Sequence, residues 1–314
     1  MNNKLIKPNF IHIFFGLFIT KLRVNKKYKN LTAPRRIGKY TLLNEFKKEF
    51  GSKNYSLGIY IDGYKKVFIK TWKGAIKDLS YFALLTEYFS NKILYKKLNS
   101  LKSSEITYKI LVPKIIGYKQ TKESFSLIFE FIGGKSLDKF PFNKQVEIFF
   151  VILKELYKIS DLFTSNEKNN FLKINKEFYL LTFPLITLVT LFSKFNNYKE
   201  IIKMVFDSLK AIKQFKTKML SLAHRDLEPH NILINGSKVY IVDCERMVFT
   251  TLHYDLNHLS LKSEFKDLST ALFKKLNLKA NKFLKNYITM QFASVPDRPN
   301  FLNFYLQELR TRYA

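Results

Sequence analysis

Residues 222–243 constrain the fold most, because they contain a polar loop followed by a tight reversal of the chain. Two apolar, β-branched runs, 232–234 and 238–242, are separated by Asn235-Gly236-Ser237. An Asn-Gly pair between such runs is the strongest short signal for a β-hairpin, since both residues tolerate a positive φ. The sequence therefore predicts two antiparallel strands with their turn at the Asn-Gly pair.

The two ends of this hairpin carry side chains that suit a hard cation. A hairpin returns the chain to its starting point, so Asn231 and Asp243 are expected at the same open end, beside the loop that holds Asp226. Oxygen ligands of this kind suit Mg²⁺, which takes one or two protein carboxylates together with waters and substrate phosphates. We therefore expect a magnesium site at the open end of the hairpin.

The loop and the strand end together resemble a known family. Residues 224–233 read His-Arg-Asp-Leu-x-Pro-x-Asn-Ile-Leu, which resembles the catalytic loop of the protein-kinase-like superfamily. Residues 241–245, Ile-Val-Asp-Cys-Glu, resemble its metal-binding segment, in which an Asp follows a strand. The match is specific, because eight defined positions fall within ten residues.

The resemblance implies a role for each polar residue of the loop. Asp226 would accept or orient the proton of the attacking hydroxyl, and Asn231 and Asp243 would hold Mg²⁺ on the nucleotide ATP. His224 and Arg225 would be structural supports of the loop. A chance polar loop before a surface hairpin is the alternative that only structural context can exclude.

A second hairpin is predicted upstream, over Leu57 to Trp72, with Asp62-Gly63 as its turn. Lys70 ends its second strand, as the family's phosphate-binding lysine does. Asp78 can cap a helix that starts near Leu79.

Glu87 is the only acidic residue between Asp78 and Glu105, so it is the natural partner of Lys70 on that helix. The resemblance implies that this glutamate orients the lysine on the nucleotide. An ordinary solvated salt bridge is the alternative reading.

The strand predicted at Phe125–Phe131 stops before Gly133-Gly134, which resembles the hinge between kinase lobes. Backbone groups of Glu130 to Ile132 would read the adenine base. No Gly-x-Gly-x-x-Gly occurs in the chain, and Gly51–Asn54 is the best substitute for a phosphate-covering loop, although a plain surface turn is equally compatible.

Departures from the protein-kinase pattern indicate the branch. Glu228 stands where protein kinases usually have lysine, and Asp243 and Asp255 are only twelve positions apart, which leaves no room for a long activation segment. About ninety residues lie between the predicted hinge and His224. This arrangement resembles the aminoglycoside, choline and lipopolysaccharide-core phosphotransferases, and Asp255 would brace the catalytic loop.

The expected fold class is α+β, a two-lobed protein-kinase-like fold with a small β-rich N-lobe containing one helix and a larger helical C-lobe. The expected parts are a basic apolar extension at 1–32, the nucleotide-binding N-lobe at 33–132 and the catalytic and acceptor-binding C-lobe at 133–314. Apolar residues at three- and four-residue spacing predict further helices. They are Asn143 to Phe163, Tyr198 to Leu220 and Asp267 to Leu284, with a core helix at Phe178 to Phe192.

The formal net charge of +29 favours anionic partners, although part of it reflects a composition rich in Lys, Asn, Ile and Phe. A basic surface repels cationic acceptors, so a neutral or anionic acceptor is expected. Among anionic partners, nucleic acid is the less favoured. The single Cys244 excludes an internal disulfide, which indicates a reducing compartment or indifference to redox, and it is expected to be a packing residue. The apolar segment Phe10 to Ile19, flanked by basic residues, either lies on an anionic membrane or packs on the small lobe. The expected location is cytoplasmic, with possible attachment at the inner face of the membrane.

These features favour an ATP- and Mg²⁺-dependent phosphotransferase that acts on a hydroxyl of a small molecule, sugar or glycolipid. An atypical Ser/Thr protein kinase is the first alternative, supported by Arg225 and opposed by the missing activation segment. A basic scaffold or pseudokinase is the second, and it is opposed by the presence of the expected polar groups.

Overall fold

The computed structural model describes residues 32–46, 55–74, 77–101, 107–193, 197–212, 220–251 and 254–293. The apolar segment Phe10 to Ile19 and the turn predicted at Gly51–Asn54 lie outside the described residues. The chain divides into two compact units, one of Met1–Leu137 with His230–Met247 and one of Asp138–Pro229 with Val248–Ala314. The predicted lobes, 33–132 and 133–314, stay a prediction.

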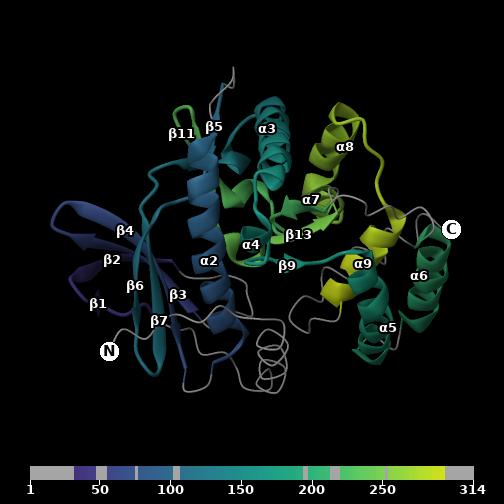
Figure 1. The fold of residues 1–314 in the computed structure, drawn as a ribbon, viewed down its shortest axis with the longest axis horizontal. Helices are drawn as coiled ribbons and strands as arrows, with labels where there is room; N and C mark the ends of the chain where they lie inside the picture. The colour runs from purple at the N-terminus through teal and green to yellow at the C-terminus, as the bar shows by residue number, and fades with distance from the viewer. Residues whose placement is uncertain are drawn as a thin grey trace. The chain divides into compact units, whose positions relative to one another are not determined.

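The first unit is built on a six-stranded sheet with the order β1-β2-β3-β4-β7-β6. Its strands are β1 (Arg36–Ile37), β2 (Tyr40–Phe46), β3 (Tyr55–Asp62), β4 (Lys65–Lys73), β6 (Ile115–Gln120) and β7 (Ser124–Glu130). Every neighbouring pair is antiparallel. The long helix α2 (Leu79–Ser100) runs alongside this curled sheet (Figure 1).

Alternation along β4 decides which side chains meet α2. Successive side chains of a strand point to opposite faces, so Phe68, Lys70 and Trp72 share one face. Phe68 and Trp72 pack in the same apolar cluster as Leu84 and Leu85 of α2. Lys70 therefore points toward the helix. It lies inside β4 and does not end the strand as the sequence analysis expected, because pairing with β3 and β7 continues to Trp72 and Lys73.

The predicted cap of α2 is present. Oδ1 of the buried Asp78 accepts hydrogen bonds from the backbone N–H groups of Ser80 (3.0 Å) and Tyr81 (3.2 Å), and from Nε1 of the buried Trp72 (2.9 Å). One carboxylate thus starts the helix and ties it to β4.

We expect Asp78→Ala to lower the free energy of unfolding by about 2–4 kcal/mol. The loss of an N-cap costs roughly 0.5–2 kcal/mol, and leaving a buried donor such as Trp72 Nε1 without its acceptor costs about 1–3 kcal/mol more. Urea denaturation followed by tryptophan fluorescence measures the effect. Asp78→Asn keeps an acceptor oxygen and should recover most of the loss; equal stability of the alanine variant and the wild type would contradict the assigned role.

The hairpin predicted after Asn231 forms the middle of a four-stranded sheet with the order β5-β12-β11-β8. Its strands are β5 (Lys109–Leu111), β8 (Lys135–Ser136), β11 (Ile232–Asn235) and β12 (Lys238–Ile241). The turn lies one residue later than predicted, because Asn235 pairs with Lys238 and Gly236 takes the positive φ of 61°. The β3–β4 turn shows the same offset, with Gly63 at φ 58°.

Gly134 also needs to be glycine, since a Cβ there would lie 2.7 Å from the carbonyl oxygen of Ile234.

The second unit combines a three-stranded sheet with helices. The sheet has the order β10-β13-β9, with β9 (Leu172–Lys173), β10 (Leu220–Ala223) and β13 (Val248–Thr251). The helices are α3 (Phe142–Asp161), α4 (Ser165–Lys168), α5 (Lys176–Ser193), α6 (Tyr198–Ala211), α7 (Tyr254–Leu259), α8 (Lys266–Lys275) and α9 (Lys282–Ala293). The mixed α+β class is confirmed, with a β-rich N-terminal sheet and a helical C-terminal part.

Two predicted helix boundaries need correction. The helix predicted to reach Leu220 ends at Ala211, and Leu220 begins β10. The helix predicted over 267–284 is two helices, because Asn277 adopts a positive φ of 52°. The amide of Asn277 donates to Lys274 O (3.1 Å) and that of Leu278 to Phe273 O (2.9 Å), which is the Schellman arrangement that ends α8.

The predicted core helix at 178–192 is present as α5, but only one of its faces is buried. Tyr179 and Phe183 lie in the core of the second unit, whereas Leu181 is 80% and Phe192 85% exposed. Within the part of the chain that the structure describes, no helix combines the length and apolar character needed to cross a bilayer.

Candidate active site

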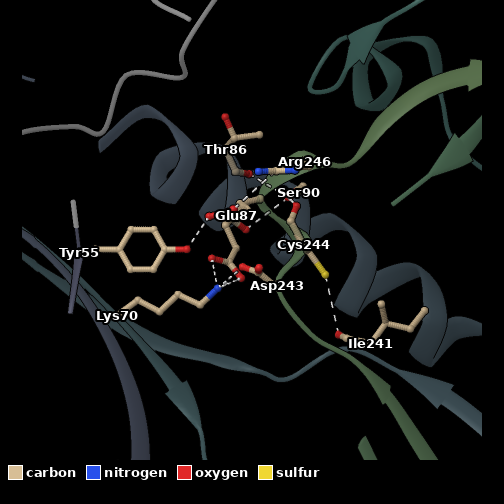
Figure 2. A network of polar contacts seen from close by, with 10 residues as sticks. Tyr55, Lys70, Thr86, Glu87, Ser90, Ile241, Asp243, Cys244 and Arg246 are labelled. Carbon is tan, nitrogen blue, oxygen red and sulfur yellow. Dashed lines mark hydrogen bonds and ion pairs between the residues drawn. The ribbon is translucent and has the colours of Figure 1, made fainter. Parts of the chain in front are cut away.

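The first unit holds a buried cluster of opposite charges around Lys70. Its Nζ lies 2.8 Å from both carboxylate oxygens of Glu87 on α2 and 2.6 Å from Oδ1 of Asp243, which follows β12 (Figure 2). Lys70 and Glu87 are 6% and 1% exposed, so this is not a solvated surface salt bridge. The ion pair predicted between Lys70 and Glu87 is therefore confirmed.

Two opposing effects set the charge of Lys70. Burial by itself lowers the pKa of the ammonium, but the carboxylates of Asp243 and Glu87 raise it by more, so the pKa of Lys70 lies well above its ordinary value. The side chain is held as a cation at every physiological pH. A fixed buried cation is suited to binding an anionic group such as a phosphate.

The hairpin brings the backbone of residues 231 and 242 together, since the amide of Val242 donates to Asn231 O at 2.9 Å. Asn231 is buried, and the side chain of Asp243 is about a quarter exposed, at 26%. Asp243 adopts a left-handed backbone with φ 62° and ψ 47°. Such a conformation is costly for a residue other than glycine and is often found at functional sites. It turns the chain out of β12 at the residue that contacts Lys70.

Glu245 and Tyr55, for which no role is predicted from the sequence, belong to the same cluster. Carboxylate oxygens of Glu87, Asp243 and Glu245 all lie within 4.8 Å of one another. The hydroxyl of Tyr55 donates to Oε2 of Glu245 at 3.1 Å, and burial, with the charge of Asp243, raises the pKa of Tyr55 well above its ordinary value. The only sequence signal for Glu245 is its place two residues after Asp243. An all-oxygen donor set of this kind fits a hard divalent cation.

Cys244, between the two acids, is a packing residue. Burial, together with the charge of Glu87, raises the pKa of its thiol well above the ordinary value, so the thiol stays protonated and unreactive. Its carbonyl oxygen accepts from Ser90 Oγ at 3.1 Å, which ties the segment to α2 (Figure 2).

The second unit holds the loop that carries Asp226. Buried Asp255 accepts hydrogen bonds from the backbone N–H groups of His224 (2.9 Å) and Arg225 (2.7 Å). Arg225 adopts a positive φ of 66°, and its guanidinium lies 5.4 Å from the ring centroid of Tyr254. These are the contacts that the predicted brace, Asp255, and the predicted supports, His224 and Arg225, require. Asp226 itself is half-buried.

Glu228 and Lys262 form an ion pair beside Asp226 that no sequence signal indicated. The side chain of Glu228 is 1% exposed. Burial raises the pKa of Glu228 to about 7; the ammonium of Lys262 acts against this rise, and the charge of Asp226 adds to it. The carboxyl group next to the predicted catalytic residue is thus poised to change its charge near neutral pH.

This shift has a measurable consequence for stability. Because the folded pKa of about 7 lies above the ordinary pKa of 4.5, the protonated carboxyl stabilises the fold fully below pH 4.5, and this contribution is lost as the pH rises through 7. We expect the unfolding free energy of the wild type to fall relative to that of Glu228→Gln over this range, measured by urea denaturation at a series of pH values. Glu264→Gln, at an exposed position in the same unit, is the control, and its unfolding free energy should change with pH as that of the wild type does. If the unfolding free energy of Glu228→Gln changed with pH in the same way, the assignment would be wrong.

The predicted hinge lies in the first unit, at the end of β7. The amide of Glu130 donates to Lys114 O (2.9 Å), and Oε1 of Glu130 accepts from the amide of Lys114 (2.6 Å). The Glu130 amide is thus already engaged by the residue that precedes β6. The predicted hydrogen bonds to an adenine base would therefore have to come from the remaining backbone groups of this segment, which ends at the half-buried Ile132.

The structure therefore brings Lys70, Glu87 and Asp243 into one cluster, next to the backbone of Asn231. Asp226, with His224, Arg225 and Asp255, forms a second cluster in the other unit. A buried cation held by two carboxylates and a braced polar loop are the parts expected of a kinase-like phosphotransferase.

Comparison with known proteins identifies the family. The family model described as the phosphotransferase enzyme family matches residues 98–276, more than half of the chain, and the protein belongs to this family. A search of curated protein sequences gave no match.

Solved structures share the fold at low sequence identity. Spectinomycin phosphotransferase APH(9)-Ia, in complex with ADP and spectinomycin, matches with 14% identity and a TM-score of 0.54, covering 84% of this chain and 88% of that one. A thermostable mutant of aminoglycoside phosphotransferase APH(4)-Ia, with AMP-PNP and hygromycin B, matches with 9% identity and a TM-score of 0.57 over 91% and 94% of the two chains. A proposed fructosamine-3-kinase from Haemophilus somnus 129PT matches with 15% identity and a TM-score of 0.52 over 85% and 92%. The predicted resemblance to the aminoglycoside phosphotransferase branch is confirmed.

Proposed function

We propose that this phosphotransferase transfers the γ-phosphate of ATP to a hydroxyl group of a small molecule, sugar or glycolipid. The observation that supports it most is the buried Lys70, fixed between Glu87 and Asp243 at 2.8 and 2.6 Å. An ammonium that is buried at the cost of desolvation and held by two carboxylates is preorganised for an anionic ligand. In the structural neighbours, the corresponding fold is crystallised with ADP or AMP-PNP.

The roles we propose follow from the chemistry of each side chain. Lys70 binds nucleotide phosphates and Glu87 keeps its ammonium in place. Asn231 and Asp243, with oxygen ligands that suit Mg²⁺, would hold the ion on the nucleotide, where it neutralises phosphate charge. Asp226, in its braced loop, orients the acceptor hydroxyl and takes its proton. Catalysis of phosphoryl transfer consists mostly of such positioning and charge stabilisation.

The charge of the protein narrows the acceptor class. Two of the structural neighbours are crystallised with spectinomycin or hygromycin B. In this chain a net charge of +29 disfavours the approach of a cationic acceptor, so we propose a neutral or anionic acceptor. The cytoplasmic location stays a prediction.

Magnesium-dependent consumption of ATP by the purified protein tests the proposal. Neutral sugars, sugar phosphates, glycolipids and an aminoglycoside should be offered in parallel, with product detected by mass spectrometry. We expect acceptor-dependent ADP formation with a neutral or anionic acceptor. Phosphate appearing only on protein side chains would favour the protein-kinase alternative, and failure to bind ATP at all would favour a scaffold.

A further inference from the structure

Two helices of the second unit expose apolar stripes to solvent. On α5, apolar side chains at four- and three-residue spacing are between 52% and 85% exposed: Leu181, Leu185, Leu188 and Phe192. This spacing places them on one face, opposite the buried Tyr179, Phe183 and Thr190. The outward face of α5 is therefore as apolar as the face that packs in the core.

The neighbouring helix α6 repeats this arrangement. Its exposed apolar side chains are between 41% and 60% exposed: Tyr198, Ile202, Phe206 and Leu209. The buried residues Ile201, Met204 and Ser208 lie on a different face. Both helices pack on α9 and on each other, as Figure 1 shows for this unit.

Lysines line one edge of the α6 stripe. Lys199, Lys203 and Lys210 are exposed, and each follows directly after an apolar residue of the stripe, so that they lie in a row beside it. The acids of α6 are only half-exposed, and Asp207 is paired with Lys282 at 2.9 Å. Long lysine side chains can bury their stems in an apolar interface while their ammonium groups reach anionic groups.

We propose that the outward faces of α5 and α6 dock on the surface of an anionic lipid bilayer. Contiguous exposed apolar stripes mark interaction sites. A stripe flanked by lysines is typical of helices that lie in the membrane interface. A net charge of +29 attracts the protein to anionic lipid headgroups. The same charge makes a second copy of the chain the poorer occupant, because two such molecules repel each other.

Flotation of the full chain with lipid vesicles tests this proposal without reference to catalysis. We expect binding to phosphatidylcholine vesicles that contain phosphatidylglycerol, weaker binding at high salt, and no binding to pure phosphatidylcholine. Lys199→Glu with Lys210→Glu should lower the partition coefficient by roughly 25-fold or more, since each basic residue near an anionic surface contributes about fivefold. Leu181→Ser with Leu185→Ser should also lower it, through lost apolar burial.

Two matched variants serve as controls. Lys274→Glu with Lys279→Glu makes the same change in net charge at exposed positions outside α5 and α6, and Leu43→Ser with Leu162→Ser removes two leucines that are 53% and 48% exposed elsewhere. The leucine control should bind as the wild type does, and the lysine control should lose much less binding than the α6 variant.

Three results would overturn the proposal. These are absence of binding by the wild type, equal binding by the α5 and α6 variants, and a self-association that the α5 leucine variant abolishes while vesicle binding is unaffected. None of them bears on ATP consumption, so failure here leaves the proposed function to its own test.

Discussion

Replacing Asp226 with asparagine is expected to lower acceptor-dependent turnover by about 10²–10⁴-fold, because a positioned general base contributes that much. The amide has nearly the same shape but does not take the proton of the hydroxyl. Since Asp226 is half-buried and its loop is braced through the backbone by Asp255, the fold should be retained. The KM for ATP should change little, because Asp226 is assigned to the acceptor and not to the nucleotide.

The measurement is steady-state phosphorylation of the best acceptor, with thermal unfolding recorded on the same preparations. Asp161→Asn is the matched control, because Asp161 is an exposed aspartate of the same unit at the end of α3. It should turn over like the wild type. Undiminished turnover of Asp226→Asn would end the proposed mechanism, whatever the acceptor is.

Lys70→Met is expected to have two separable effects, a loss of turnover and a loss of stability. Removing one partner of a buried ion pair leaves an uncompensated charge, which costs about 3–5 kcal/mol. Here Glu87, 1% exposed, would lose the ammonium at 2.8 Å from both of its oxygens. Turnover should fall by about 10²–10³-fold, the usual effect of removing one preorganised electrostatic group, and nucleotide affinity should fall with it.

A double variant separates these effects. Lys70→Met combined with Glu87→Gln removes a cation and an anion together, so stability should recover most of the loss while turnover stays low. Urea denaturation and ATP titration calorimetry measure the two quantities. If the double variant regained ATP binding and turnover, Lys70 would be a structural ion-pair partner only, and the nucleotide would have to bind elsewhere.

Local chemistry made much of this fold predictable from the sequence. The hairpins at Asp62-Gly63 and Asn235-Gly236 are predicted from the sequence because Asp-Gly or Asn-Gly between β-branched runs strongly favours a tight hairpin turn. The one-residue offset in both turns arose because glycine, which has no Cβ, takes the positive φ, while the preceding Asp62 or Asn235 stays in the strand and pairs. The cap at Asp78 was likewise a local signal.

Helix ends were less predictable where a local signal competed with the apolar spacing. Asn277 could have indicated the end of α8, since asparagine is among the few residues other than glycine that adopt the left-handed conformation after a helix. The leucines on either side of it continued the helical spacing and concealed this. The prediction of a core helix is wrong for the outward face of α5, because an apolar run does not show which of its faces a neighbour will cover.

The sequence by itself determined the two glycine hairpins, the strand β7, the first helix of the sheet unit and the family to which the catalytic loop belongs, because each depends on residues close together along the chain. The tertiary structure alone decided that Tyr55 contacts Glu245, 190 positions away, and that Lys262 pairs with Glu228. It also decided that Lys70 contacts Asp243, 173 positions away. Such contacts depend on how the strands and helices pack, and the spacing of residues along the sequence does not specify that packing.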